Sequence, residues 1–348
     1  MIYILTFALL VRLALFIRPT IPLRSDSLDY HGLAISLTKG LYFVDGTQLD
    51  QFRTPGYPFF ISVVYRIFGI SPRMVVLFQI FVNLGSICMT YLIGREMFSE
   101  TVGLIAAGVL TVEPDFLKNV YLILTETLYT LLLLAAFYYA LTGSWMLCAL
   151  FLAAGTYTKP AAQFLPPLFC LVLTWMDSAF MLFSYALFVL PWYVRNLIYY
   201  DTFSLSSITG YNLFFYNVGM TIVKIGMKTH RTQQSFRLSK MYTKLAKKFI
   251  RKYPWLYFKG QLKGIRRMFM QCGVKPCRLQ YAMLFAVYSC ALLGSAVLVF
   301  RGNYTPLLGI LITGYFAALA GAVGMARFRV PVTPFYLLIA IYFVSLVI

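Results

Sequence analysis

The chain has 348 residues, of which 60% are hydrophobic, 18% aromatic and 12% charged. A soluble domain carries about 25% charged residues, so this composition excludes a water-soluble globular enzyme. The apolar residues form blocks close to the roughly 20 residues that a helix needs to cross a bilayer. Because unpaired backbone groups are not tolerated in lipid, such blocks must be helical. The sequence therefore predicts an all-α integral membrane protein.

The net charge of +19 is distributed unevenly. All 11 acidic residues lie at or before Asp201, whereas 16 of the 30 Lys and Arg residues fall between Lys224 and Arg278. A basic segment without acids, set between apolar blocks, is typical of chains that lie against anionic head groups or bind an anionic substrate. Nucleic acid is a poor candidate because the surrounding chain is buried in lipid.

In chain order, the apolar pattern predicts about ten helices, and a shorter segment is an eleventh candidate. The ten are expected near residues 1–18, 74–94, 102–113, 120–142, 145–157, 161–176, 179–199, 281–300, 304–323 and 330–348. The first contains Arg12 but no cleavage signal, so we expect it to be retained. Residues 57–70 contain Arg66 and are too short for a confident span, so we expect a surface or re-entrant helix.

Two polar loops separate these blocks. In the first outer loop, residues 19–73, the pattern from Ser27 to Leu37 predicts a helix on the membrane surface. The basic outer loop, residues 201–280, predicts two amphipathic helices broken at Tyr253-Pro254. Membrane anchoring is the favoured role of these two helices, and steering of an anionic acceptor such as a lipid A-like glycolipid is the alternative.

If the N-terminus is cytoplasmic and residues 57–70 do not cross, every polar cluster emerges on the outer side. Loops rich in Lys and Arg tend to stay cytoplasmic, which would place the basic loop inside. That tendency weakens for loops longer than about 60 residues. We therefore expect one outer face to carry all the polar clusters.

Six short motifs follow one another along the chain. They are Asp26-Ser27-Leu28-Asp29-Tyr30, Arg53-Thr54-Pro55-Gly56-Tyr57-Pro58, Thr125-Glu126-Thr127-Leu128, Thr158-Lys159-Pro160, Pro191-Trp192-Tyr193-Val194-Arg195-Asn196 with Gly210-Tyr211-Asn212-Leu213 and Asn217, and Arg327-Phe328-Arg329-Val330-Pro331 with Pro334. Each is weak alone, but their order resembles that of the GT-C glycosyltransferases. These multispanning enzymes use polyprenyl-phosphate sugars and include the aminoarabinose transferases and the protein O-mannosyltransferases.

The resemblance implies a single GT-C-like transmembrane domain over residues 1–348, without the soluble domain that larger members append. Thr54 departs from the family's motif by replacing its first proline. This departure bears on the identity of the acceptor more than on the type of reaction. The implied reaction is hexosyl or pentosyl transfer, with inversion, from a polyprenyl-phosphate donor to a lipid, glycan or protein acceptor. The implied place is the outer or lumenal face, as in a bacterial inner membrane with a periplasmic active site.

The carboxylates have roles that this chemistry requires. A general base is worth about 10²–10⁴-fold in rate. Asp26 is the candidate base and Asp29, one turn later, is the reserve; a helix N-cap is the alternative role of Asp26. Glu126 lies in an apolar helix, where a carboxylate is costly and usually functional. Its alternative role is an ion pair with Lys118 or Arg195 that only holds helices together.

The cations suit a phosphate. The expected substrate-binding residues are Arg53, Lys159, Arg195, Arg329 and Arg327, together with Tyr57 and Asn196 of the matching motifs. For Lys159 and Arg195, snorkelling from a helix end is the alternative. Glu113 and Asp115 are expected to be ordinary loop charges.

Other readings stay open at this point. A transporter or flippase of an anionic lipid or lipid-linked sugar would also use Glu126 and arginines at helix ends. A non-catalytic subunit anchored by its basic loop is a third reading. No cofactor is expected and no metal cluster is evident, although a divalent ion shared by Asp26 and the donor phosphate is not excluded. Cys272 and Cys277 are spaced so that a disulfide is permitted but not required.

Overall fold

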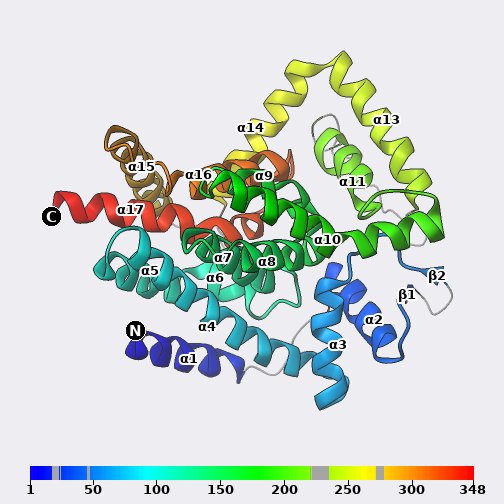
Figure 1. Cartoon of the computed structure of the whole chain (residues 1–348), viewed down its shortest axis with the longest axis horizontal. Helices are drawn as coiled ribbons and strands as arrows, with labels where there is room; N and C mark the ends of the chain where they lie inside the picture. Colours follow the sequence, from blue (N-terminus) through cyan, green and yellow to red (C-terminus); the bar gives the residue numbers. More distant parts are fainter. Residues whose placement is uncertain (18–22, 24, 45–47, 220, 222–234, 272–277) are drawn as a thin grey trace.

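The computed structural model describes the chain except residues 18–22, 24, 45–47, 220, 222–234 and 272–277. The described part is dominated by helices (Figure 1). The α-helices are α1 (Ile2–Phe16), α2 (Asp26–Thr38), α3 (Gly56–Phe68), α4 (Pro72–Met97), α5 (Glu100–Val112), α6 (Pro114–Asn119), α7 (Glu126–Leu141), α8 (Trp145–Thr158), α9 (Pro166–Phe169), α10 (Trp175–Tyr200), α11 (Ile208–Tyr211), α13 (Phe236–Lys252), α14 (Pro254–Met270), α15 (Arg278–Phe300), α16 (Leu307–Ala320) and α17 (Thr333–Val347).

Three further helical segments are not α-helices: the 3-10 helices η1 (Pro160–Phe164) and η4 (Ala326–Val332) and the π-helix η2 (Asn212–Gly219). The strands β1 (Phe43–Val44) and β2 (Gln48–Leu49) form a small antiparallel hairpin.

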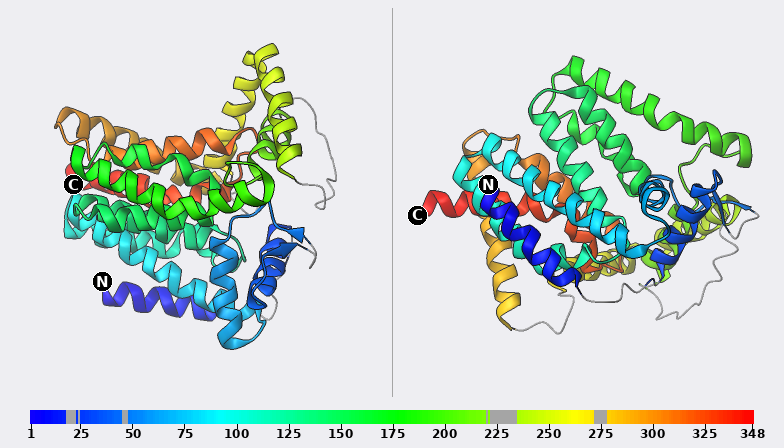
Figure 2. Two further views of the ribbon diagram at one scale, coloured as in Figure 1. Left: turned by 45° about the vertical axis from the view of Figure 1, so that its right-hand side comes forward. Right: turned by 90° about the horizontal axis from the view of Figure 1, so that it is seen from below.

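Four described helical segments are long and apolar enough to cross a membrane: Pro72–Met97, Trp175–Tyr200, Tyr281–Phe300 and Ala326–Val347. The shorter apolar helices α1, α5, α7, α8 and α16 pack among them, and together they form a bundle (Figures 1 and 2). The chain is therefore an all-α multi-pass membrane protein, as its composition predicts. A single domain over residues 1–348 stays a prediction.

One end of the bundle carries the polar elements. In the left view of Figure 2, α2 and α3 lie across that end, and α13 and α14 cross the same end on the opposite side. The surface helix predicted from Ser27 to Leu37 is α2, and α3 lies beside it as a short helix. The predicted break at Tyr253-Pro254 is also confirmed, because α13 ends at Lys252 and α14 begins at Pro254.

The prediction of one helix over residues 161–176 is wrong. This stretch contains the 3-10 helix η1 and the four-residue helix α9 instead. Pro160, Pro166 and Pro167 explain the difference, since proline lacks the N–H that a continuing helix needs. The predicted helix 120–142 begins later, at Glu126. Cys272 and Cys277 lie outside the described residues, whereas Cys88, Cys148, Cys170 and Cys290 are free.

Arg12 joins the first helix to the bundle. Its side chain is fully buried, and its Nε donates to Asn83 Oδ1 at 2.6 Å. Its Nη1 donates to the carbonyl oxygens of Ala8 and Thr111 at 3.1 and 3.3 Å. Because a buried charge must be hydrogen-bonded, these contacts tie α1 to α4 and α5.

The helix α14 is attached to the loop that precedes η4 through glycines. A Cβ placed on Gly264 would lie 1.7 Å from the carbonyl oxygen of Gly321, and one on Gly324 would lie 1.7 Å from that of Gly264. Real Cβ atoms do not approach so closely, so only glycine permits this contact. The position of α14 and the start of η4 are therefore coupled.

We predict that Gly264→Ala lowers thermal stability in detergent, because forced overpacking costs about 1–3 kcal/mol. Gly314→Ala is the matched control, since a Cβ at Gly314 meets nothing within 4 Å. Thermal unfolding of the two variants against the wild type is the measurement. An unfolding temperature for Gly264→Ala equal to that of the control would contradict the close contact.

Candidate active site

A cavity of about 620 Å³ opens beside the start of α2, with Asp26 and Asp29 in its lining. This is within the range of about 300–1,000 Å³ found for small-molecule sites. The charged residues in its wall are Asp26, Asp29, Arg53, Glu126, Lys159 and Arg327. They come from five separate parts of the chain, and the structure brings these six expected residues into one cavity wall. The wall is also charge-balanced, with three cations facing three carboxylates.

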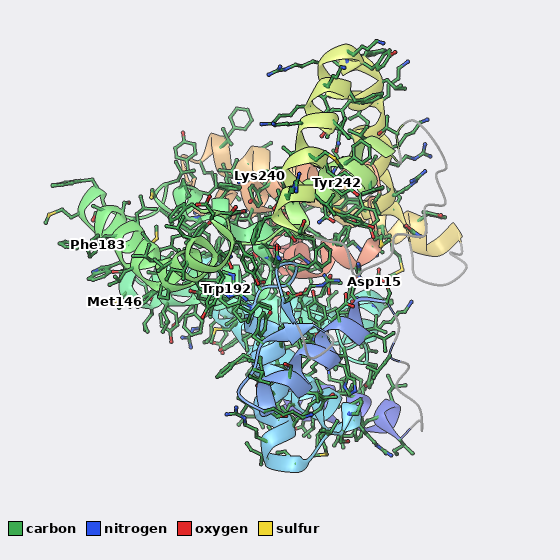
Figure 3. All side chains as sticks on the ribbon, turned by 90° about the vertical axis from the view of Figure 1, so that its right-hand side faces the viewer. Asp115, Met146, Phe183, Trp192, Lys240 and Tyr242 are labelled. Carbon is green, nitrogen blue, oxygen red and sulfur yellow. The ribbon has the colours of Figure 1, made fainter. Side chains whose placement is uncertain are left out.

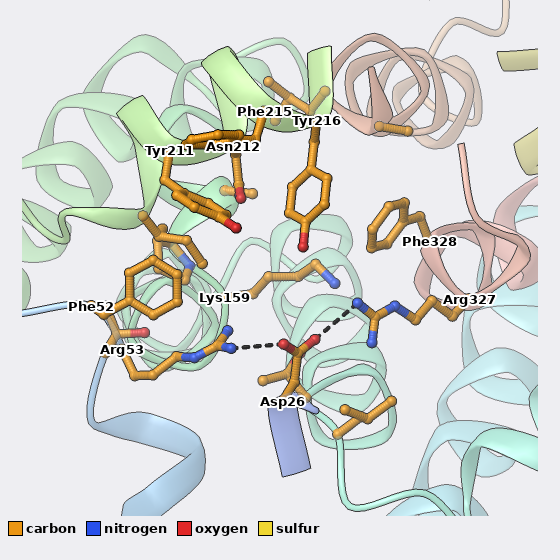
Figure 4. A pocket seen from close by; sticks show the side chains of 18 of the residues that line it. Asp26, Phe52, Arg53, Lys159, Tyr211, Asn212, Phe215, Tyr216, Arg327 and Phe328 are labelled. Atoms are coloured by element: carbon orange, nitrogen blue, oxygen red, sulfur yellow. Dashed lines mark hydrogen bonds and ion pairs between the residues drawn. The ribbon is translucent and has the colours of Figure 1, made fainter. Parts of the chain in front are cut away.

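Asp26 is held between two arginines (Figure 4). Arg53 Nη2 donates to Asp26 Oδ1 at 2.8 Å, and Arg327 Nη2 donates to Asp26 Oδ2 at 2.9 Å. The same Nη2 of Arg53 reaches Asp29 Oδ2 at 2.9 Å. Each oxygen of Asp26 therefore has its own guanidinium, and Asp29 helps to hold Arg53.

The environment of Asp26 sets its protonation. Burial alone would raise the pKa of its carboxyl group, but the charges and hydrogen bonds of Arg53 and Arg327 outweigh burial and lower the pKa to about 2. Asp26 is thus ionised at neutral pH. Its alternative role as an N-cap is wrong, because the cap position of α2 is Ser25 and Asp26 is the first residue of the helix.

Glu126 and Lys159 form the second ion pair of the cavity. Lys159 Nζ donates to Glu126 Oε1 at 3.2 Å, and Arg327 Nε lies 4.0 Å from the same oxygen. Glu126 is therefore paired with Lys159 rather than with the expected Lys118 or Arg195. Its fixed place next to Lys159 follows from α7 and α8 packing against each other.

Several polar atoms of this wall are left without a hydrogen bond. Within the described part of the chain, these are the Nε atoms of Arg53 and Arg327 and the Oε2 atom of Glu126. A buried donor without a partner costs about 1–3 kcal/mol. These three atoms are buried from solvent, so the wall holds its charged groups together at an energetic cost.

An aromatic roof faces these charges. Tyr211, Asn212, Phe215 and Tyr216, from α11 and η2, lie on the side of the cavity opposite Asp26, and the Tyr216 hydroxyl points toward Lys159 (Figure 4). The motif match of this segment did not predict that it covers the cavity. The available signal was the cluster of aromatic residues from Tyr211 to Tyr216 within an otherwise polar loop.

A glycine aligns two of the motifs. A Cβ on Gly56 would lie 2.7 Å from the backbone nitrogen of Thr158, so the start of α3 touches the end of α8 backbone to backbone. Gly56 lies three residues after Arg53, and Thr158 directly precedes Lys159. This contact therefore keeps the two cations on the same cavity.

Four of the expected binding residues lie outside the cavity wall, and three of them make hydrogen bonds close to it. Tyr57 is fully buried and donates to Gln79 Oε1 at 2.6 Å. Arg195 donates to Asn196 Oδ1 at 2.6 Å and to the carbonyl oxygen of Asp50 at 3.0 Å. Asn196 donates in turn to the carbonyl oxygen of Ser204 at 2.7 Å. These side chains fix the loops next to the cavity.

Arg329 also lies away from the cavity wall. It is 2% exposed, is bonded to Asp115, lies 4.0 Å from Glu113 and donates to the carbonyl oxygen of Phe269 at 2.7 Å. Glu113 and Asp115 are thus part of a buried ion-pair cluster, and the expectation that they are ordinary loop charges is wrong. Their partner is more than 200 residues away in the chain, and no local pattern indicates it.

The described residues offer no ready metal site. No group of three His, Cys, Asp or Glu side chains among them is placed to hold an ion. Asp26 and Asp29 converge on a guanidinium instead. The expectation that no cofactor is needed stays a prediction.

We predict that two neighbouring arginines contribute very differently to stability. Arg329→Met leaves Asp115 buried without its partner, which costs about 3–5 kcal/mol, so its unfolding temperature falls sharply. Arg327→Met leaves Asp26 paired with Arg53 and Glu126 paired with Lys159, so stability changes little. Thermal unfolding in detergent distinguishes the two, and equal losses would contradict the separation of a buried cluster from a cavity wall.

Comparison with known proteins agrees with this architecture. The family described as dolichyl-phosphate-mannose-protein mannosyltransferase matches residues 53–199. No curated protein matches the chain in sequence. The structure is similar to the oligosaccharyltransferase of Archaeoglobus fulgidus in the apo form, with a TM-score of 0.62 and 14% identity over 97% of this chain and 50% of the other. The form of that enzyme with Zn and sulfate gives a TM-score of 0.63 and 14% identity over 99% and 49%.

A third structure is ArnT from Cupriavidus metallidurans bound to undecaprenyl phosphate, with a TM-score of 0.51 and 11% identity over 99% of this chain and 77% of the other. The chain spans about half the length of the oligosaccharyltransferase that it matches. At these identities the likeness shows a shared fold. The protein is therefore a multi-pass membrane protein with the GT-C glycosyltransferase fold, which confirms the resemblance found in its motifs.

Proposed function

We propose that this protein transfers a sugar from a polyprenyl-phosphate donor to an acceptor that enters the cavity. The observation that carries the proposal is the cavity itself: an ionised aspartate held between two arginines, with a lysine beside them, at one end of a GT-C bundle. The matched family is described by its dolichyl-phosphate-mannose donor, and one similar structure contains undecaprenyl phosphate.

The donor phosphate is placed between Arg53, Lys159 and Arg327. Both arginines line the cavity, and a guanidinium offers a planar fork of donors that suits phosphate oxygens. Since the wall carries equal numbers of cations and carboxylates, the phosphate must compete with Asp26 and Glu126 for these cations. The cations then neutralise the charge that develops on the leaving phosphate.

This competition changes Asp26. A carboxylate with a pKa of about 2 is a weak base. When a phosphate takes one guanidinium away, the loss of an adjacent cation raises the pKa of Asp26 by about 1–3 pH units. Donor binding thereby makes Asp26 a stronger base at the moment when the acceptor needs one.

The reaction is a single displacement. The acceptor hydroxyl or amine attacks the anomeric carbon and its proton passes to Asp26, while the bond from that carbon to the phosphate oxygen breaks. Polyprenyl phosphate leaves with the electron pair, and the anomeric centre is inverted. Asp29 positions Arg53, Glu126 positions Lys159, and the roof around Tyr211 and Tyr216 contacts the sugar and the first isoprene units.

The direct contacts belong to residues of the cavity wall. Tyr57, Arg195, Asn196 and Arg329 shape the cavity through their own hydrogen bonds and act on the donor indirectly. The acceptor is a lipid, a glycan or a protein. The site faces the outer or lumenal side, as in the periplasm of a bacterial inner membrane, because long basic loops are exempt from cytoplasmic retention.

The transporter reading has less support. Alternating access places a site near the midplane of the bilayer, between repeats that rock against each other. Here the charged cavity is lined by Asp26 at the start of α2 and by Phe249 of α13, elements that lie at one end of the bundle.

Sugar transfer in liposomes tests the proposal. The protein is supplied with a panel of polyprenyl-phosphate sugars and a native lipid extract, and products are followed by mass spectrometry. We expect wild-type transfer and a loss of at least about 100-fold in Asp26→Asn, since the base is removed. Asp177→Asn is the matched control, because this half-buried carboxylate lies outside the cavity wall at the start of α10, where it accepts a hydrogen bond from Thr174 Oγ1 at 2.8 Å. Comparable rates in the two variants would remove Asp26 from the mechanism.

The pH dependence tests the activation of Asp26. The value of kcat/KM for the donor reports the free enzyme, so Asp26, with its pKa of about 2, causes no loss above about pH 4. The value of kcat reports the bound state, so its acid limb lies about 1–3 pH units higher. Burial raises the pKa of Asp50 to about 6, and an Asp50→Asn background removes that titration. Identical acid limbs for both constants would contradict displacement of an arginine by the donor.

A further inference from the structure

The two helices that cross the end of the bundle, α13 and α14, form a basic arm that the reaction leaves unexplained. The arm has seven basic residues on α13 and four on α14, and residues 202–348 contain no Asp or Glu. The basic residues are Arg237, Lys240, Lys244, Lys247, Lys248, Arg251, Lys252, Lys259, Lys263, Arg266 and Arg267. All eleven are exposed.

On α13 the charges lie on one side. Their spacing of three and four residues places all seven on a single face of the helix. Ala246, on the opposite side, is fully buried against the protein. Met241 and Leu245 lie at the border of the basic face and are each 44% exposed. An exposed apolar edge therefore adjoins the charges.

On α14 three faces are separate. Gly260, Gly264 and Met268 face the protein and are buried. Trp255, Phe258 and Leu262 recur at the same helical spacing and are 64%, 48% and 49% exposed. Lys259, Lys263 and Arg266 form the stripe next to them. The apolar stripe is thus turned away from the protein and bordered by positive charge.

Cations and aromatic rings are also in direct contact on the arm. Lys259 Nζ lies 5.4 Å from the centre of the Trp255 ring, and Lys252 Nζ lies 5.2 Å from that of Tyr253. Aromatic residues with Lys or Arg beside them are enriched where a protein meets the head-group region of a bilayer. In each of these pairs the aromatic ring and the cation lie close enough to occupy the same depth in a head-group region.

The arm is also placed where it can reach the lipid around the bundle. In the left view of Figure 2 it rises across the end of the bundle and extends past its side. Seen from that end in Figure 3, α13, which carries the labelled Lys240 and Tyr242, projects away from the body that contains Met146 and Phe183. A structure that overhangs the bundle at this level lies above the lipid around the protein.

We propose that the α13–α14 arm is a docking surface for the anionic head groups of the surrounding bilayer. Its apolar stripe of Trp255, Phe258 and Leu262 enters the boundary between head groups and acyl chains, and its basic stripes contact the lipid phosphates. An amphipathic helix with a basic polar face binds an interface in this way. A soluble acidic partner would match the charge but would leave the apolar stripe in water.

This inference does not rest on the proposed reaction. The attraction per Lys or Arg beside an anionic surface corresponds to roughly a fivefold change in affinity. It weakens with ionic strength, because the screening length falls to about 3 Å at 1 M salt. Lipid charge and salt are therefore the two variables that separate this surface from a purely apolar contact.

The first test measures lipid preference. Purified full-length protein in detergent is titrated with phosphatidylglycerol and with phosphatidylcholine of the same chain length. The test variant combines Lys247→Gln, Lys248→Gln, Arg251→Gln and Lys252→Gln. The matched control combines Lys39→Gln, Arg66→Gln, Arg95→Gln and Arg301→Gln, which removes four exposed charges elsewhere. Thermal unfolding confirms that both remain folded.

We expect the wild type and the control to prefer phosphatidylglycerol, and the arm variant to lose at least fivefold of that preference, the effect of a single charge. High salt abolishes the preference. Equal affinity for both lipids in the wild type, or an unchanged preference in the arm variant, would overturn the proposal.

The second test locates the apolar stripe. Quenching of tryptophan fluorescence by acyl-brominated lipids is compared between the wild type and Trp255→Phe in nanodiscs. The difference isolates Trp255 from the other tryptophans. We expect Trp255 to be quenched in discs that contain phosphatidylglycerol and less so at high salt. No quenching of Trp255 in those discs would show that the arm stands clear of the bilayer and would overturn the docking geometry.

Discussion

The site depends on one carboxylate shared by two arginines. Asp26 receives Arg53 from the first loop and Arg327 from the last, residues that lie 27 and 301 positions away. These ion pairs bring segments from both ends of the sequence together in the cavity wall. The Glu126–Lys159 pair adds the start of α7 and the end of α8 to the same wall. Buried ion pairs are weak contributors to net stability but costly to break, so they specify geometry more than they add strength.

The elements that carry Asp26, Arg53 and Arg327 are held in place mainly by close backbone packing, and in one case by an ion pair. Gly56 lets α3 touch the end of α8, and the Gly264–Gly324 contact attaches α14 to the loop before η4. The exception is Arg329, which ties α6, η4 and α14 together two residues from Arg327. The backbone at Arg327 is therefore held in place. A ligand that binds the Arg327 side chain has to replace its ion pairs but does not have to move the backbone.

The bundle, the surface helix α2 and the break at Pro254 could be predicted because periodicity and proline act locally. Counting the membrane crossings between the polar segments puts their loops on one side of the membrane. The sequence could therefore predict that these side chains come together: Asp26, Arg53, Glu126, Lys159 and Arg327. The burial of Arg329 against Asp115 could not, since its partner is set by tertiary packing alone. The roof around Tyr211 and Tyr216 was missed for the same reason: nothing local says that an aromatic loop folds back over a distant aspartate.

A structure of the protein with bound polyprenyl phosphate tests the central claim most directly. We expect the phosphate within hydrogen-bonding distance of Lys159 and of at least one of Arg53 and Arg327, with that arginine withdrawn from Asp26. A phosphate bound elsewhere, with both arginines still on Asp26, would contradict the proposed site and its activation by the donor.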